Sequence, residues 1–142
     1  MFIKQISIFT ENRNGAIMEI TGILAGADIN IRALSIADTS DFGVVRLIAD
    51  KPVEAIAALK AKDMTVIETD VISISVGDTP GSFHKALEAL FKGAVMVEYA
   101  YAFVAPIGGG ATVILRCREQ EKAIELLSHD GVRILSQDEV SR

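Results

Sequence analysis

The chain repeats itself, and this internal repeat constrains its fold more than any other feature. Gly15 and Gly81, 66 positions apart, each follow a strand-like run and open a helical one. Three further stretches match in the same order: LAGADINIRALSI (24–36) with LFKGAVMVEYAYA (90–102), GVVRLIAD (43–50) with GATVILRC (110–117), and AIAALKAKDMTVIETDVI (55–72) with AIELLSHDGVRILSQDEV (123–140). Because a fixed-period repeat is typical of repeated structural units, the sequence predicts two related modules, residues 1–70 and 71–142.

Each module has the pattern strand, helix, strand, strand, helix, strand. The stretch VISISV (71–76) alternates apolar and Ser positions, as a strand with two unlike faces does. Four apolar residues after the second glycine share one helical face: Phe83, Leu87, Leu90 and Phe91. The order βαββαβ predicts an α+β, ferredoxin-like fold, with an antiparallel sheet and both helices on one face. A sheet of four strands leaves its other face and two edges open, so we expect the two modules to pair side by side into a larger sheet.

Composition narrows the class of partner. The net charge is −5 and the chain has no basic run, which makes it a poor candidate for binding nucleic acid or anionic membranes. No apolar stretch is long enough to span a bilayer, and Lys4 and Gln5 interrupt the apolar N-terminus, so no signal peptide is predicted. Cys117 is the single cysteine, which fits a reducing cytoplasm. A hydrophobic content of 50% favours a partner surface, and a homodimer is the simplest form of one.

The turns ENRNG (11–15) and GDTPG (77–81) occupy the same place in the two modules, where the first strand gives way to the first helix. A helix N-terminus carries unpaired N–H groups and a partial positive charge, and glycine lets another group approach the backbone. Two interpretations stay open. Either the glycines only permit the turn while Asn12 or Asn14 caps the helix, or the turns aim bare N–H groups at an anion such as a free α-carboxylate.

The stretch FTENRNGAIMEITGILAGADINIRALSIADTSDFGVVRLIAD (9–50) resembles an ACT domain, the small-molecule-sensing module of many amino-acid-metabolic enzymes. The stretch VGDTPGSFHKALEALFKGAVMVEYAYAFV (76–104) resembles a second ACT domain. The resemblance rests on a distributed pattern that covers nearly the whole chain, with a Pro-Gly-type turn before helix one and an Asn-Ile pair in strand two. The whole chain is similar to free-standing tandem ACT proteins, including those related to acetolactate synthase regulatory subunits.

This resemblance implies that an amino acid binds where two ACT modules meet. Its carboxylate would contact N–H groups of the turn between strand one and helix one, and its ammonium and side chain would contact that turn and strand two of the neighbouring module. The implied turn residues are Glu11, Asn12, Arg13, Asn14, Gly15, Ala16 and Ile17 in one module and Asp78, Thr79, Pro80, Gly81, Ser82 and Phe83 in the other.

The strand-two residue differs between the modules. Asn30 matches the family's Asn, which can accept from an ammonium and donate to a carboxylate. Met96 takes that place in the second module, and Asn14 stands where the family usually has Pro. Either the two interfaces therefore bind unequally, or one of them is vestigial.

Two interpretations stay open for the aromatic residues outside the turns. Tyr99, Tyr101 and Phe103 alternate and so share one strand face. They form either a wall of the ligand pocket, with Tyr99 binding the ligand, or packing against the other module or a second chain. His84 and His129 are the only histidines and lie far apart in the sequence, so no metal site and no catalytic dyad is predicted.

The sequence holds no nucleophile–base pair, metal-spaced cluster or cofactor-binding pattern. We therefore expect a non-catalytic regulatory protein that binds a free amino acid and needs no cofactor. One alternative is an accessory regulatory subunit of an amino-acid biosynthetic enzyme such as acetolactate synthase. Two others are a ferredoxin-like RNA-binding module, which the acidic charge disfavours, and a small enzyme on this fold.

Overall fold

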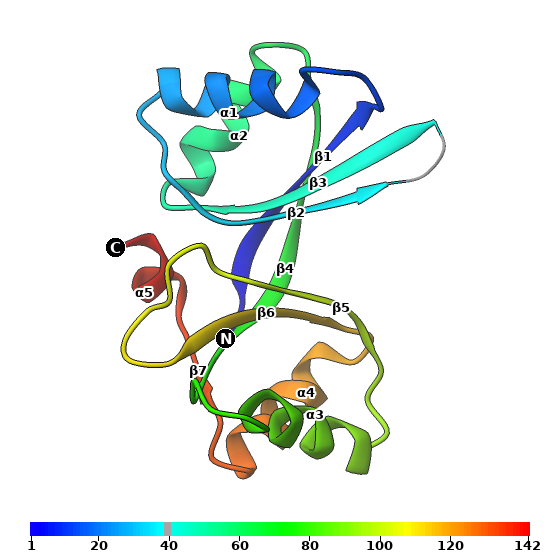
Figure 1. Cartoon of the computed structure of the whole chain (residues 1–142), viewed down its shortest axis with the longest axis vertical. Coiled ribbons are helices and arrows are strands. Elements are labelled where there is room, and N and C mark those ends of the chain that lie inside the picture. Colours follow the sequence, from blue (N-terminus) through cyan, green and yellow to red (C-terminus); the bar gives the residue numbers. More distant parts are fainter. Residues whose placement is uncertain (39–40) are drawn as a thin grey trace. The chain divides into compact units, whose positions relative to one another are not determined.

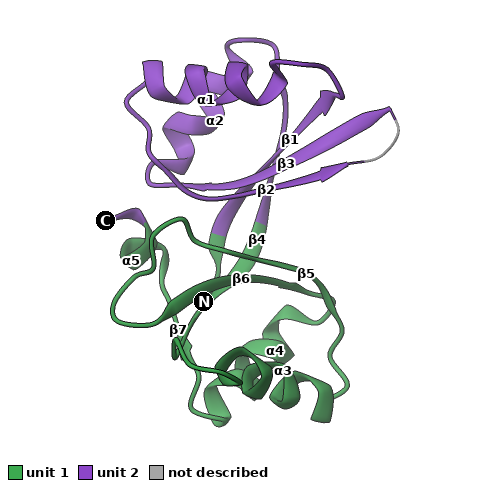
Figure 2. Cartoon of the chain, viewed as in Figure 1, with its two compact units in different colours: residues 1–3, 70–140 green, residues 4–69, 141–142 purple. Residues whose placement is uncertain are grey.

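The structure is a computed structural model that describes residues 1–38 and 41–142. It divides into two compact units (Figure 2). The N-terminal unit, purple in the figure, comprises residues 4–69 with 141–142, and the C-terminal unit, green, comprises residues 70–140 with 1–3. One long strand, β4 (Thr65–Val76), continues from the first unit into the second.

The N-terminal unit contains one complete βαββαβ motif (Figure 1). Its elements are β1 (Ile3–Glu11), α1 (Ala16–Gly26), β2 (Ile31–Asp38), β3 (Phe42–Ala49), α2 (Pro52–Lys60) and the first part of β4. The strand order is β2-β3-β1-β4, and β3 pairs antiparallel with both β1 and β2. The registers Ile6↔Leu47 and Ile8↔Val45 place four apolar side chains on the face that the two helices cover.

The C-terminal unit repeats this plan. It contains the remainder of β4, α3 (Ser82–Lys92), β5 (Val97–Ala102), β6 (Ala111–Cys117), α4 (Gln120–His129), β7 (Arg133–Ile134) and α5 (Gln137–Ser141). β6 and β7 pair with β4 on its two sides and β5 pairs with β6, all antiparallel, so the order β7-β4-β6-β5 matches that of the first unit. The α+β, ferredoxin-like fold is therefore confirmed in each unit, while the side-by-side pairing of modules stays a prediction.

Each unit has its own hydrophobic core between sheet and helices. Ile20 and Leu24 of α1 are fully buried against β1 and β3, and Leu90 of α3 is 1% exposed in the second core. The expectation that Phe91 shares this buried face is wrong, because its side chain is 83% exposed. Consecutive helical residues differ by about 100° in direction, so Leu90 and Phe91 do not share one narrow stripe. No helix among the described residues is both long and apolar enough to cross a membrane.

Candidate functional site

The turns that precede α1 and α3 have the same backbone geometry. Gly15 precedes α1 with φ 86° and ψ −3°, and Gly81 precedes α3 with φ 85° and ψ −3°. This left-handed conformation is open to glycine and disfavoured for residues with a Cβ. A Cβ built on either glycine would meet nothing within 4 Å, so it is the backbone conformation, and not crowding, that requires glycine at both positions.

Neither helix has a side-chain cap among the described residues. The N–H of Ala16 donates to the Arg13 carbonyl at 3.3 Å, and the N–H of Ser82 donates to the Thr79 carbonyl at 3.2 Å. The next N–H groups of each first turn have no acceptor within the helix, as is general for helix N-termini. The interpretation that Asn12 or Asn14 caps the first helix is therefore wrong, and the binding of an anion by the bare N–H groups stays a prediction.

The polar side chains of the first turn bind elsewhere. The Asn12 amide donates to the Asp38 carboxylate at the end of β2, and the Arg13 guanidinium pairs with Glu19 on α1. The hydrogen bond to Glu19 and the attraction of its charge raise the pKa of Arg13. These two contacts tie the turn to the end of β2 and to α1, and neither of them uses the backbone N–H groups of the first turn of α1.

The second turn is braced internally. The hydroxyl oxygens of Thr79 and Ser82 are hydrogen-bonded at 2.7 Å. A Cβ on Gly77 would approach the Ser82 hydroxyl to 3.0 Å, so the chain passes close to the start of α3. Asp78 and Pro80 are exposed. The two turns thus share a backbone geometry and differ in the side chains that stabilise it.

A shallow crevice lies beside each turn, against the loop that follows the second helix of that unit. Beside the first turn its volume is about 250 Å³, and beside the second about 270 Å³. Glu19 and Lys62 line the first crevice, whereas Lys85 and Asp130 stand at the corresponding places of the second. The charges at these two positions are thus exchanged between helix and loop, and Glu11, Arg13 and Asp63 add further charges to the first crevice.

The structure places Asn30 away from the Gly15 turn of its own unit. Asn30 directly precedes β2 and so follows α1, whose eleven residues separate it from Gly15 by roughly 16 Å. The Asn30 N–H donates to the Asp50 carboxylate at 2.9 Å, and its side chain is exposed. Met96 holds the equivalent place before β5 and is 54% exposed. A role for Asn30 at the turn of a neighbouring module stays a prediction.

Tyr99 lies on β5, an edge strand of its unit. Its ring stacks on that of Tyr101, with centroids 6.5 Å apart and an interplanar angle of 27°. Both rings are half-buried, and Phe103 beyond them is 8% exposed. Stacking between residues two apart on a strand confirms that these side chains share one face. It leaves the ligand-wall role of Tyr99 a prediction.

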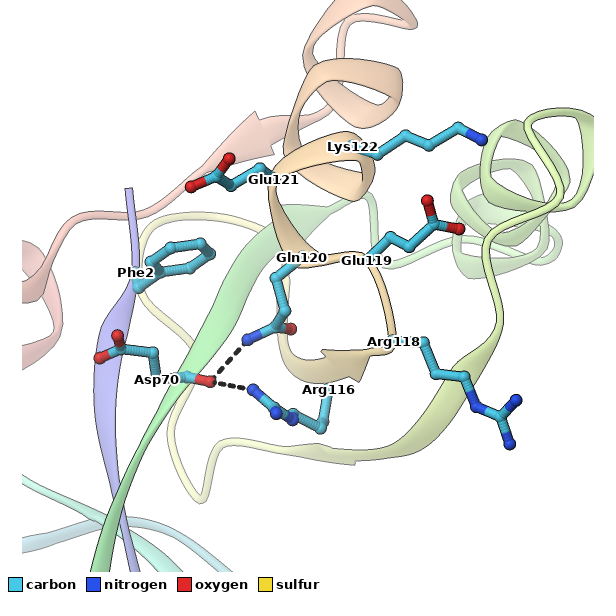
Figure 3. Close-up of a pocket in the computed structure, with 8 residues that line it drawn as sticks. All are labelled: Phe2, Asp70, Arg116, Arg118, Glu119, Gln120, Glu121 and Lys122. Atoms are coloured by element: carbon cyan, nitrogen blue, oxygen red, sulfur yellow. Dashed lines mark hydrogen bonds between the residues drawn. The ribbon is translucent and has the colours of Figure 1, made fainter.

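Sequence reasoning missed a polar hollow of about 530 Å³ in the C-terminal unit (Figure 3). The carbonyl of Asp70 accepts from Arg116 at 2.9 Å and from the Gln120 amide at 2.6 Å. The Gln120 oxygen accepts in turn from the Cys117 N–H at 3.0 Å. Arg118 and Lys122 extend away from this carbonyl (Figure 3). The central polar groups therefore bind each other and fix β4 to the start of α4.

Among the other reactive side chains, Cys117 is buried and His84 lies on the surface of the C-terminal unit. Burial raises the pKa of the Cys117 thiol to about 11, so the thiol stays protonated at neutral pH. His84 pairs with Glu88 at 3.2 Å on an exposed surface. Over residues 1–38 and 41–142, no three His, Cys, Asp or Glu side chains lie in a group that could hold a metal ion.

Comparison with known proteins gives the family. The profile described as an ACT domain pair matches residues 1–142. The chain is 38% identical to protein BT0572 from Bacteroides thetaiotaomicron, covering 100% of this chain and 97% of that one with a TM-score of 0.92. Regulatory subunits of aspartate kinase from Thermus thermophilus and Thermus flavus share the fold. The Thermus thermophilus subunit is 18% identical, and the match covers 89% of this chain and 91% of that one. The Thermus flavus subunit is 17% identical, and the match covers 90% of this chain and 92% of that one. Both have a TM-score of 0.60. A comparison with curated protein sequences finds no match.

Proposed function

The chain belongs to the ACT domain family, and from this membership we propose that it is a non-catalytic regulatory protein that binds a free amino acid through its two glycine turns. One observation carries the proposal: two helix N-termini, 66 residues apart, have the same left-handed glycine and no side-chain cap. A structural turn needs the glycine, but a capping side chain at that position would stabilise the helix by roughly a few tenths of a kcal/mol more. Leaving both helices uncapped is understandable if a ligand supplies the acceptor.

In this proposal the carboxylate of the amino acid accepts hydrogen bonds from the first-turn N–H groups. In the first turn these belong to Ile17 and Met18, and in the second turn to Phe83 and His84. The partial positive charge of the helix N-terminus adds to the attraction. Residues 1–70 and 71–142 act as the two modules, and the flanking residues Glu11 to Ala16 and Asp78 to Ser82 shape the two sites. We assign Asn30 and Tyr99 to the wall that a neighbouring module contributes.

The two sites are proposed to be unequal. The first combines its turn with Glu19, already paired with Arg13, whereas the second has Lys85 on α3 facing a crevice with Asp130. The strand-two position is Asn30 for one site and Met96 for the other. A ligand that fits both turns would therefore bind them with different affinities.

A thermal-shift screen against the twenty amino acids, followed by calorimetric titration of each hit, tests the proposal. A ligand held at a hundred times its Kd stabilises the folded state by about 2.7 kcal/mol, which shifts the melting temperature of a chain of this size by several degrees. Gly15→Val and Gly81→Val should each remove one site, because a side chain strains the left-handed conformation that orients the N–H groups of the turn.

Gly108→Val is the matched control. Gly108 also has a left-handed φ, of 78°, and a Cβ there meets only Arg133 at 3.8 Å. The backbone strain is therefore similar while both glycine turns stay intact, and binding should be unchanged. An unchanged number of bound ligands per chain in both turn variants, or binding that disappears in Gly108→Val as well, would show that the turns do not hold the ligand.

A second candidate is an accessory regulatory subunit of a biosynthetic enzyme such as acetolactate synthase. Exposed apolar side chains such as Phe91 and Val104, 83% and 74% exposed, favour a protein partner. The regulatory subunits of aspartate kinase show that chains of this fold serve as such subunits in other proteins. A change in the activity of the purified catalytic subunit on adding this chain would support this role, and an unchanged activity at saturating concentrations would reject it.

A further inference from the structure

The outward face of α1 carries almost no charge. Its only charged residue is Glu19, while Met18 is 75% exposed and Gly22, Ala25 and Gly26 are exposed beside it. A helix that is apolar on all sides is normally covered by other structure. The equivalent helix α3 has His84, Lys85, Glu88 and Lys92 at the positions corresponding to Met18, Glu19, Gly22 and Gly26. The first helices of the two modules therefore differ in their exposed faces: that of α1 is almost uncharged, whereas that of α3 is charged.

An apolar groove runs between α1 and α2 on this face. Its volume is about 580 Å³, and its lining is Glu19, Gly22, Ile23, Gly26, Ala27, Ala58, Ala61 and Lys62. A Cβ built on Gly22 or Gly26 would meet nothing within 4 Å, so the groove is open beside both glycines. Glu19 and Lys62 stand at one end, and the floor of the groove is otherwise uncharged.

The corresponding groove of the C-terminal unit is filled by its own side chain. Leu126 of α4 packs on Gly93, so closely that a Cβ on Gly93 would lie 2.2 Å from a Leu126 methyl carbon. In the N-terminal unit the same two positions are Ala27 and Ala58. Within one chain, therefore, the same helix pair is closed in one unit and left open in the other.

We propose that the open face of α1 and α2 is a dimer interface, and that its occupant is the same face of a second copy of this chain. Around a two-fold axis near Gly22, the α1 helices of the two copies would pack antiparallel. Met18 and Gly26 each lie four residues from Gly22, so Met18 of each copy stands opposite Gly26 of the other. The largest exposed side chain of the helix thus meets a glycine that lines the groove.

This size match within one helix favours a second copy over an unrelated partner, because an isologous contact requires a surface to be complementary to itself. Small residues at the crossing point let the two helix axes approach to about 8 Å. The single charged residue of α1 is also compatible with this antiparallel contact. Glu19 is already paired with Arg13 in its own chain, and two antiparallel helices crossing at Gly22 would set the two Glu19 residues about 9 Å apart along the axis.

Sedimentation velocity of the full chain and of two variants tests the interface. Met18→Lys places a charge in the contact opposite Gly26 of the other copy, while Phe91→Lys introduces a lysine at the comparably exposed residue of α3. We expect the unaltered chain and Phe91→Lys to sediment as dimers, and Met18→Lys as a monomer with an unchanged circular dichroism spectrum. A monomeric unaltered chain at about 100 µM, a dimeric Met18→Lys, or dissociation by both variants would overturn the proposal.

A crosslinking experiment tests the same geometry without weakening the contact. Gly22→Cys places two thiols at the two-fold axis, within the Cα separation of about 4.4–6.8 Å that a disulfide requires. Glu88→Cys is the equivalent position of α3, and the native Cys117 is fully buried. Mild oxidation should crosslink Gly22→Cys quantitatively and leave Glu88→Cys monomeric on a non-reducing gel. An uncrosslinked Gly22→Cys, or equal crosslinking of the two variants, would reject this interface.

Discussion

Gly93→Ala is the substitution that most directly tests how the two helix pairs differ. Gly93 ends α3 with φ −89° and ψ 6°, and Ala27 ends α1 with φ −96° and ψ 8°. The backbone at this position therefore already accepts alanine in the other unit. Any loss of stability must come from packing, where the new Cβ would lie 2.2, 2.9 and 3.1 Å from three carbon atoms of Leu126.

The magnitude follows from two opposing effects. Forcing an extra methyl group into a filled site costs about 1–3 kcal/mol. Replacing glycine by alanine where the backbone permits it stabilises by about 0.4–1 kcal/mol, because the unfolded chain loses freedom. In the unaltered chain the clash dominates, and Gly93→Ala destabilises. With Leu126→Ala already present, as Ala58 is in the other unit, the clash is gone and Gly93→Ala should stabilise.

The assay is a double-mutant cycle by urea unfolding at one fixed protein concentration. The sign of the Gly93→Ala effect should reverse between the two backgrounds, which gives a coupling energy of at least about 1 kcal/mol. Additive effects in the two backgrounds would refute the claim that Leu126 closes the groove of the C-terminal unit.

Three further outcomes are expected. Because burial raises the pKa of Cys117 to about 11, the folded state should lose stability as the pH rises from about 9 to about 11, and the pH profile of Cys117→Ala should lack that loss in urea unfolding. Gly110→Ala should destabilise by at least about 1 kcal/mol, since its Cβ would lie 2.1 Å from a β4 carbonyl oxygen, while Gly109→Ala meets nothing within 4 Å and should be neutral in the same assay. Gln120→Ala removes the hydrogen bonds to Asp70 and Cys117, a cost of about 1–3 kcal/mol measurable as a lower urea midpoint.

The repeat made the fold of each unit predictable from the sequence. Apolar spacing identifies the helices and strands, and the order βαββαβ leaves few alternatives for four strands and two helices. The glycine turns were predictable for a similar reason, since a glycine between a strand and a helix signals a backbone conformation that other residues disfavour. The absence of a side-chain cap could not be read from the sequence, because Asn12 is a good capping residue that binds Asp38, 26 residues away.

Long-range packing accounts for the features that the sequence did not reveal. The Asp70 carbonyl is held by residues 46 and 50 positions later in the chain, and a backbone acceptor leaves no mark in a sequence. The short helix α5, with Val140 fully buried, depends on the same kind of tertiary contact. The open groove became visible only when the helix pairs were compared, because alanine at positions 27 and 58 is unremarkable without Gly93 and Leu126 beside it.

The proposed ligand turn and the proposed dimer interface share α1, and this makes their independence testable. The carboxylate would bind N–H groups at the start of α1, while the second copy would pack on the outward face of the same helix, beginning at Met18. If the ligand and the second copy favour the same position of this helix, each must raise the binding affinity of the other by the same factor. A factor of about 5–150 is typical of allosteric coupling. Sedimentation with and without an amino acid found in the screen gives one factor, and titration above and below the dimer dissociation constant gives the other. Gly15→Val should abolish the coupling, whereas Gly81→Val should preserve it, since α3 lies outside the interface. Equal dimer affinity with and without ligand would show that the two sites act separately.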